Sequence, residues 1–411
     1  MAFKTSPPAR SIDPERAVAR AASYRSAIDS FIVMDVMSRA AAREASGQRV
    51  IHMEVGQPAS PAPELAREAA KRAVDANALG YTLALGTRPL RERIAQYYRD
   101  SYGVSVSPGR VVVTTGSSAG FVLAFLALFD VGARVGLPEP GYPCYRHILS
   151  ALGQVPVAIE TGEATRWMPT VASIAALSEA PGGLDGILIA SPANPTGTML
   201  EPERLRAISR LCEDRGIWFI SDEIYHGLTY TGTPQTALAH SDEAIVINSF
   251  SKYFSMTGWR VGWMIVPERL VRPIERLAQN FYIAPPAISQ VAALAACDAH
   301  EELQANVAVY ARNRALLLEG LPRIGLDKIV PADGAFYLYC DVGHLTGDSL
   351  AFANEMLEET GVAATPGIDF DPRRGHRYIR FSYAGSTDDM AEALERLGRW
   401  QRLATGTGLG T

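Results

Sequence analysis

The sequence predicts an α/β fold, with a large domain built on a mainly parallel seven-stranded sheet and a smaller α+β domain. Between Val111 and Val266, short β-branched runs alternate with longer helical patterns, as in units that build a parallel sheet. After Pro286 the pattern changes to a long Ala-rich helical run. The chain has 411 residues, of which 47% are hydrophobic and 20% charged. This length can bury a large core and favours two or more domains.

These patterns divide the chain into four segments. Residues 1–13 are polar and contain proline, so we expect a flexible N-terminal tail. Residues 14–48 include a helix around 31–45. We expect this segment to pack with the small domain, because the large-domain pattern begins only after it. The large domain then covers residues 49–286, and the small domain covers residues 287–411.

Seven apolar runs are the expected strands of the large domain. Strands this apolar are expected to be covered by helices on both faces. Active-site residues should gather at the carboxyl ends of the strands, where an open α/β sheet leaves its crevice. The expected strands are 111–115, 134–137, 155–159, 186–190, 218–221, 244–248 and 261–266. The expected helices between them include 117–129, 145–152 and 202–215.

The small domain is expected to combine helices with short apolar segments. It begins with the Ala-rich helical run, which we expect to end near Leu321. The elements that follow are the segment 336–341, a helix at 349–360, the segment 378–383 and a final helix from Thr387. This mixture indicates an α+β arrangement, and no internal repeat is evident.

Composition argues against several functional classes. The formal net charge of -5 gives no electrostatic reason to expect nucleic acid or an anionic membrane surface as partner. The four cysteines form no CxxC pair and the seven histidines form no metal-binding pattern, so neither disulfides nor a metal site is expected. No secretory signal or membrane-spanning run is found, and we therefore expect a cytoplasmic enzyme acting on small molecules.

Lysine is rare in this chain, and this makes one lysine conspicuous. Of 39 basic residues only four are lysines, namely Lys4, Lys71, Lys252 and Lys328. Arginine cannot replace lysine where an amine must lose its proton and attack a carbonyl, because guanidinium stays protonated. Lys252 alone lies among small and aromatic residues, which favours a chemical role for its amine.

Two polar motifs directly follow the fourth and fifth expected strands. Asn194 lies in the segment Ser191 to Gly197, where its side chain can donate into the crevice, although such a Pro/Gly segment is equally a turn. Asp222 is followed three residues later by Tyr225. Aspartate is also a favoured N-cap residue, so the alternative role of Asp222 is to cap the next helix. A buried carboxylate needs a cationic partner, and a protonated pyridine nitrogen would be one.

The sixth expected strand leads directly to Lys252. Ser249 and Ser251 precede it, and Arg260 follows eight residues after it. A lysine near a strand end is more often a solvated charge, but its rarity and the nearby arginine favour function here. The forked guanidinium of Arg260 suits a phosphate, and the serine hydroxyls can add further hydrogen bonds.

The first expected strand ends at a Gly/Ser-rich turn, Gly116-Ser117-Ser118. A helix that begins here presents free backbone N–H groups and a positive dipole end, which suit a phosphate. Alone the signal is weak, because many helices begin with serine or threonine. The turn is not a Walker loop, and it lacks the GxGxxG spacing of a dinucleotide site.

From about Val50 to Tyr383 the chain resembles the class I/II aminotransferase family of fold type I pyridoxal 5'-phosphate (PLP) enzymes. Several motifs in the family's order carry this resemblance, which makes it highly specific. The motifs are Gly56-Gln-Pro, Ala193-Asn-Pro-Thr-Gly, Asp222-Glu-Ile-Tyr, Ser249-Phe-Ser-Lys and Arg380-Phe-Ser-Tyr.

The resemblance implies a role for each matching residue around PLP. Lys252 would form a Schiff base with the cofactor, and Asp222 would keep the pyridine nitrogen protonated. Asn194 and Tyr225 would hydrogen-bond the phenolic oxygen of the ring, and Tyr142 would stack on its face. Together these residues would make the ring an electron sink for chemistry at the substrate α-carbon.

The same resemblance implies how the phosphate and the substrate are bound. The phosphate ligands would be Gly116, Ser117, Ser118, Ser249, Arg260 and Tyr81 of a neighbouring subunit. The substrate would contact Arg380, which clamps the α-carboxylate through two parallel bonds, together with Asn194 and the backbone near Gly56. The implied assembly is a homodimer whose active sites lie at the subunit interface.

The implied activity is transfer of an amino group between an L-2-amino acid and a 2-oxo acid, by way of pyridoxamine phosphate. Two departures from the family leave the substrates open. Tyr142 stands where many relatives carry tryptophan, and Ser118 stands where some dicarboxylate-specific relatives place lysine. Two alternatives remain, a PLP-dependent lyase (a C–S lyase or a cyclopropane-forming synthase) on the same scaffold and a catalytically silent PLP-binding domain.

Overall fold

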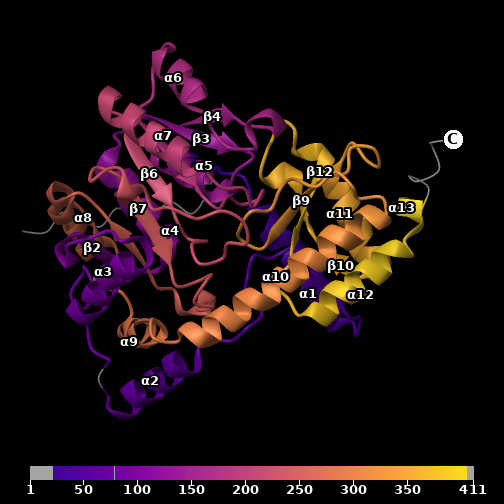
Figure 1. Cartoon of the computed structure of the whole chain (residues 1–411), viewed down its shortest axis with the longest axis horizontal. Helices are drawn as coiled ribbons and strands as arrows, with labels where there is room; N and C mark the ends of the chain where they lie inside the picture. The colour runs from indigo at the N-terminus through magenta and orange to yellow at the C-terminus, as the bar shows by residue number, and fades with distance from the viewer. Residues whose placement is uncertain (1–21, 78, 405–411) are drawn as a thin grey trace, which may run out of the picture.

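The computed structural model describes residues 22–77 and 79–404, and it has the predicted α/β architecture (Figure 1). One part is built on a seven-stranded sheet and the other on a three-stranded sheet. The long helix α10 (His300–Arg323) runs from the first part toward the second (Figure 1). The expected tail, residues 1–13, lies outside the described residues. Within the described ranges, no helix has the length and apolar character needed to cross a bilayer.

The seven-stranded sheet is mostly parallel, as predicted. Its strands are β2 (Val111–Thr114), β3 (Arg134–Glu139), β4 (Val155–Glu160), β5 (Gly186–Ala190), β6 (Trp218–Asp222), β7 (Ile245–Ser249) and β8 (Gly262–Ile265). They are ordered β2-β8-β7-β6-β5-β3-β4. Strand β8 is antiparallel to β2 and β7, and β3, β4, β5, β6 and β7 pair in parallel. Each strand coincides with one of the apolar runs.

Helices cover both faces of this sheet, because successive residues of a strand point to opposite sides. Val112, Leu188 and Ile247 pack into one apolar cluster, and Val113 and Ile189 pack into another. The helices of the first cluster are α4 (Gly116–Leu128), α5 (Pro143–Leu152) and α8 (Glu268–Phe281). Those of the second are α3 (Arg88–Tyr102), α6 (Val171–Glu179) and α7 (Pro202–Arg215).

The smaller part joins the N-terminal region to the C-terminal region. Its antiparallel sheet has the order β11-β12-β9, and a short parallel pair joins β1 to β10. Helix α1 (Ile32–Ala45) packs here, because Val36 and Ala40 cluster with Leu357 and Ala363. The remaining elements are β1 (Ile51–His52), β9 (Tyr337–Asp341), α11 (Ser349–Thr360), β10 (Val362–Ala363), β11 (Thr365–Pro366), β12 (Tyr378–Ser382), α12 (Thr387–Gly398) and α13 (Gln401–Ala404).

The Ala-rich run after Pro286 differs from the prediction of one continuous helix. It forms two helices, α9 (Ala287–Ala296) and α10, and α9 packs against α2 (Glu64–Asp75). The Arg93 side chain donates to the Cys297 carbonyl at 2.8 Å and to the Asp298 carboxylate at 3.1 Å. These contacts occupy the Cys297 carbonyl at the break between α9 and α10. The alanine-rich composition, which favours helix throughout, hid the interruption.

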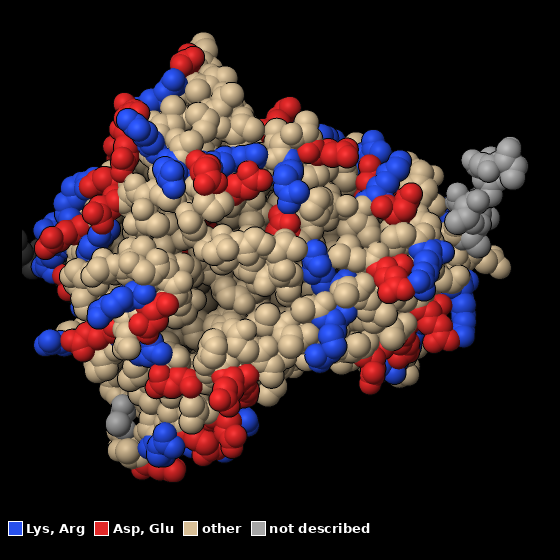
Figure 2. Space-filling view, in the orientation of Figure 1, with Lys and Arg blue, Asp and Glu red and all other residues tan. Residues whose placement is uncertain are grey.

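The charged side chains of the molecule are mixed rather than grouped by sign. On the face drawn in Figure 2, Lys and Arg alternate with Asp and Glu around the rim, and the hollowed centre carries few of either. In the described part of this face, the basic residues do not form a patch of their own.

Candidate active site

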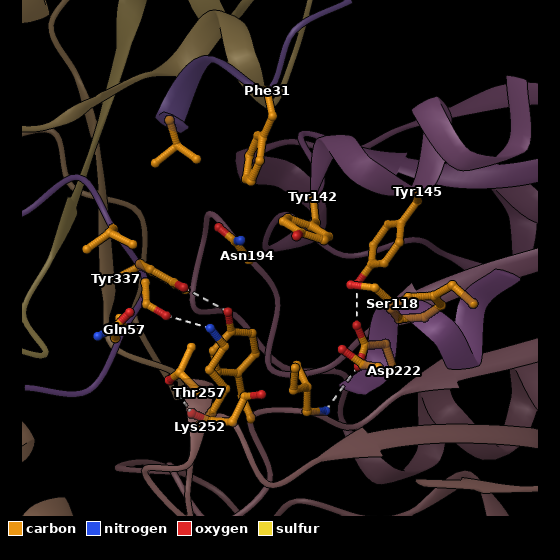
Figure 3. Close-up of a pocket in the computed structure, with 18 of the residues that line it drawn as sticks. Phe31, Gln57, Ser118, Tyr142, Tyr145, Asn194, Asp222, Lys252, Thr257 and Tyr337 are labelled. Carbon is orange, nitrogen blue, oxygen red and sulfur yellow. Dashed lines mark hydrogen bonds between the residues drawn. The ribbon is translucent and has the colours of Figure 1, made fainter. Parts of the chain in front are cut away.

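A cavity of about 210 Å³ lies where β5, β6 and β7 end, as Figure 3 shows in close-up. Polar residues at the carboxyl ends of these strands meet in it, because parallel strands end at the same edge of a sheet. The predicted site residues that line the cavity are Gly56, Ser117, Ser118, Tyr142, Asn194, Asp222, Tyr225, Lys252, Arg260 and Arg380.

Lys252 lies in the loop after β7, with its amine in the cavity. Its Nζ donates a hydrogen bond to the Gly56 carbonyl. Burial, together with the guanidinium groups of Arg380 and Arg260, lowers the pKa of Lys252 to about 8 against the opposing effect of Asp222. The amine therefore loses its proton more easily than an ordinary lysine, which suits a nucleophile or a base.

Asp222 is the last residue of β6 and is 2% exposed. Its carboxylate accepts hydrogen bonds from the Tyr145 hydroxyl and, at 3.1 Å, from the Ile224 amide. Burial raises the pKa of Asp222 to about 6, although both hydrogen bonds favour the charged form. At neutral pH the cavity therefore contains a buried carboxylate whose hydrogen-bond partners are neutral, and this arrangement suits a cationic ligand group.

An anion cradle lies at the first turn of α4. A Cβ on Gly116, which has a φ of +78°, would lie 2.3 Å from Arg260 Nη2, so only glycine leaves this space open. Ser117 and Ser118 follow in the same turn, where the helix presents free N–H groups. Arg260 Nη1 lies 3.5 Å from the Ser251 hydroxyl. Amides, hydroxyls and a guanidinium thus converge, as a phosphate requires.

Arg380, in β12, is 2% exposed and faces the cavity. Its Nη1 donates to Asn194 Oδ1 at 2.8 Å, and its Nη2 donates to the Glu54 carbonyl and the Thr365 hydroxyl. The guanidinium lies 4.4 Å from the ring centroid of Tyr337. Its Nε has no hydrogen-bond partner among the described residues, so the fork still has donor capacity for a carboxylate.

Gly56 and Tyr225 are connected through Tyr337, which the sequence did not indicate as a site residue. The hydroxyls of Tyr225 and Tyr337 are 2.7 Å apart. A Cβ on Gly56 would lie 1.8 Å from the Tyr337 hydroxyl oxygen, so a side chain there would displace this tyrosine. The glycine therefore allows Tyr337 to hold Tyr225 beside the cavity.

Tyr145 and the first turn of α1 are the largest parts of the site that sequence reasoning missed. Tyr145 lies three residues after Tyr142, a spacing that puts both on one helix face and was the available signal. Phe31, Val33 and Met34 also line the cavity. The Phe31 ring meets Tyr142 edge-on, with centroids 5.7 Å apart and planes at 84° (Figure 3). This contact depends on tertiary packing, so no local pattern reveals it.

Some predicted residues do not line the cavity. Ser249 is 1% exposed, and its hydroxyl donates to Ser251 Oγ at 2.8 Å, so Ser251 lines the cavity and Ser249 supports it. Gly116 forms the cradle from behind, against Arg260. Tyr81 is 88% exposed on the surface. Within the described ranges, His, Cys, Asp and Glu form no group of three or more that could hold a metal ion.

Comparisons with known proteins agree with this geometry. The sequence profile of the family "Aminotransferase class I and II" matches residues 48–397. Over 382 residues the chain is 50% identical to a valine–pyruvate aminotransferase of Mycobacterium tuberculosis, which covers 92% of this chain and 98% of the relative.

Solved structures agree as well. The fold matches the crystal structure of an aminotransferase from Mycobacterium tuberculosis with a TM-score of 0.90 at 50% identity, covering 93% of this chain and 99% of that one. It also matches the aspartate aminotransferase from Thermus thermophilus with maleate, with a TM-score of 0.87 at 32% identity. That match covers 92% of this chain and 99% of the Thermus chain.

Proposed function

Since this chain belongs to the aminotransferase class I and II family and is a transaminase, we propose that it transfers the amino group of an apolar L-2-amino acid to a 2-oxo acid. One observation carries the proposal: the Lys252 amine, the Asp222 carboxylate and the Arg380 guanidinium line the same cavity at the strand ends. The relatives are aminotransferases, which favours group transfer over the lyase and silent alternatives.

The family implies PLP as the cofactor, and the residues of the cavity fit it. The anion cradle at the first turn of α4 has room and donors for a phosphate. We assign the binding of this phosphate to Ser117, Ser118, Ser251 and Arg260. When bound, PLP supplies a conjugated ring that withdraws electrons from the substrate α-carbon. Asp222 would hold the ring nitrogen protonated, because a buried carboxylate favours a neighbouring cation.

The remaining ring contacts are assigned to three side chains. Asn194 Oδ1 accepts from Arg380 Nη1, which leaves the Asn194 amide N–H groups as donors for the ring's phenolic oxygen. Tyr225, held by Tyr337, would donate to the same oxygen. Tyr142 would cover the face of the ring, and its own contact with Phe31 fixes its plane.

Lys252 would carry the cofactor and then move the proton. With a pKa of about 8, its Nζ is partly neutral near physiological pH and can attack a carbonyl carbon. Once an amino acid is bound, the same neutral Nζ can take the proton from the substrate α-carbon and deliver it again. The hydrogen bond to the Gly56 carbonyl keeps the amine on the cavity side of its loop.

Arg380 would bind the α-carboxylate, and the wall toward α1 would receive the side chain. The charged residues among the described cavity residues are Asp222, Lys252, Arg260 and Arg380. Each of these already has a role, so no further cation in this set remains for a second substrate carboxylate. The wall formed by Phe31, Val33 and Met34 is apolar. Together with the valine–pyruvate relative, this supports a valine-like donor and pyruvate as acceptor.

We also propose that the working enzyme is a homodimer. Four large apolar side chains, Tyr81, Leu83, Phe281 and Ile283, are 88%, 68%, 56% and 55% exposed. A second copy would cover them and would bring Tyr81 to the phosphate cradle of its neighbour. Sedimentation of the purified protein tests this, and a stable monomer with full activity would contradict it.

The half-reaction tests the proposed function most simply. Holoenzyme is mixed with one amino acid at a time, and the near-visible absorbance of the cofactor is followed. We expect valine and similar apolar amino acids to convert this band rapidly and aspartate to convert it slowly, and pyruvate should then restore it. Release of ammonia without restoration by any oxo acid would contradict transfer, and a preference for aspartate would contradict the apolar donor.

A further inference from the structure

Helix α1 begins without a capping residue of its own. The N-cap position is Phe31, whose side chain offers no hydrogen-bond acceptor. Asp369 supplies the cap instead, although it lies 337 residues after Ile32 in the chain. Its Oδ1 accepts from the Ile32 amide and its Oδ2 accepts from the Val33 amide, each at 3.3 Å. One carboxylate thus satisfies two of the free N–H groups of the first turn and faces the positive end of the helix dipole.

Asp369 is itself held rigidly. It is 1% exposed and ends a short 3-10 turn, Gly367–Asp369. Arg146 of α5 donates to its carbonyl at 2.6 Å. Burial raises the pKa of Asp369, but the Ile32 and Val33 amides favour its charged form. The carboxylate is therefore a fixed point to which the start of α1 is attached.

The turn that Asp369 caps carries the apolar wall of the active-site cavity. Phe31 packs edge-on against Tyr142 with ring centroids 5.7 Å apart, and Val33 and Met34 line the cavity beside it. Figure 3 shows Phe31 and Tyr142 on the opposite side of the cavity from Lys252. The position of the first turn of α1 therefore sets how much room a substrate side chain has.

We propose that Asp369 is a positioning residue that selects the substrate: by capping α1 from outside, it holds Phe31 against Tyr142 and limits the donor to short apolar side chains. The proposal rests on the proposed function, an aminotransferase of apolar amino acids. Without the cap the first turn frays, Phe31 leaves the wall, and longer side chains enter. Asp369 acts through α1 and does not touch the reacting atoms.

The test compares Asp369→Ala with a matched loss of a cap elsewhere. Thr170 caps α6 with its own side chain, whose hydroxyl oxygen accepts from the Ser173 amide at 3.0 Å, and it does not line the cavity. Thr170→Ala should therefore leave the substrate preference as in the wild-type protein. In Asp369→Ala, we expect amide hydrogen exchange to accelerate in residues 29–36 and to stay unchanged in the rest of α1.

Kinetics give the second readout. For Asp369→Ala we expect the KM for valine to rise about fivefold with kcat nearly unchanged. A fivefold change in affinity corresponds to the free energy that a typical helix cap contributes. The preference for valine over phenylalanine should fall by a similar factor. Phe31→Ala should lose the same preference, and adding Asp369→Ala to it should change little more, because both act through one contact.

A more conservative variant keeps the test valid if Asp369→Ala does not fold. Asp369→Asn retains one side-chain oxygen, so we expect intermediate exchange rates and an intermediate preference. Unchanged exchange in residues 29–36, or an unchanged substrate ranking in the variants that fold, would overturn the proposal. This outcome would leave the proposed function standing, since that depends on the wild-type half-reaction alone.

Discussion

Replacing Tyr145 with phenylalanine tests how Asp222 keeps its charge. The Tyr145 hydroxyl donates to the Asp222 carboxylate in a site where both residues are buried. A hydrogen bond to a charged group contributes about 1.5–3 kcal/mol, and one pKa unit corresponds to about 1.4 kcal/mol. Loss of the hydroxyl should therefore raise the pKa of Asp222 from about 6 by about one to two units.

Two assays on the protein without cofactor measure this shift. Carbon NMR of labelled aspartate carboxyls follows the titration of Asp222 directly. Stability gives an independent measure, because the folded-state pKa of Asp222 lies above its ordinary value of 3.8. The folded protein then binds the proton more tightly than the unfolded chain, so this residue's contribution to the free energy of unfolding falls as pH rises from about 4 to the folded-state pKa. The fall should end near pH 6 in the wild-type protein and about one to two units higher in the variant.

Tyr339→Phe is the matched control for this experiment. Tyr339 is also buried, but its hydroxyl has no hydrogen-bond partner among the described residues. Its removal should leave the titration of Asp222 where it is in the wild-type protein. If Asp222 titrates at the same pH in Tyr145→Phe as in the wild-type protein, the hydroxyl does not stabilise the carboxylate and the reasoning is refuted.

Three further substitutions probe other parts of the site. Lys252→Ala should abolish the half-reaction while the cooperative thermal unfolding is retained, and Lys328→Ala, which removes a lysine outside the cavity, should leave both unchanged; residual turnover in Lys252→Ala would contradict the assignment. Arg260→Gln should raise the dissociation constant of PLP by about 10- to 100-fold, because it removes charge-assisted bonds to the phosphate; equilibrium dialysis measures this, and unchanged retention would contradict the cradle. Gly56→Ala should lower the free energy of unfolding by about 1–3 kcal/mol, because the new Cβ meets the Tyr337 hydroxyl. Urea unfolding of Gly56→Ala with and without Tyr337→Phe checks this, and strictly additive effects would argue against the clash.

The sequence predicted the large sheet well because its strands are buried on both faces. Apolar runs such as 186–190 and 218–221 are hard to place anywhere except in a covered parallel sheet. The antiparallel placement of β8 beside β2 and the break between α9 and α10 could not be predicted in the same way. They depend on pairings and side-chain contacts between distant segments.

The same distinction applies to the site. Asp222 ends a buried strand, and Asn194 and Lys252 follow shortly after two others, so their convergence follows from the geometry of a parallel sheet. Phe31 reaches the cavity only because α1 packs on the smaller part of the molecule and Asp369 fixes its first turn. A contact across 337 residues leaves no local pattern to read.

Borohydride treatment of the holoenzyme, followed by peptide mapping, tests the central claim most directly. The reagent fixes the cofactor to the amine that carries it, and mass spectrometry then identifies the modified residue. We expect the label on the peptide that contains Lys252, and on no other of the four lysines in the chain. A label on Lys4, Lys71 or Lys328, or no covalent label in protein that binds PLP, would contradict the account.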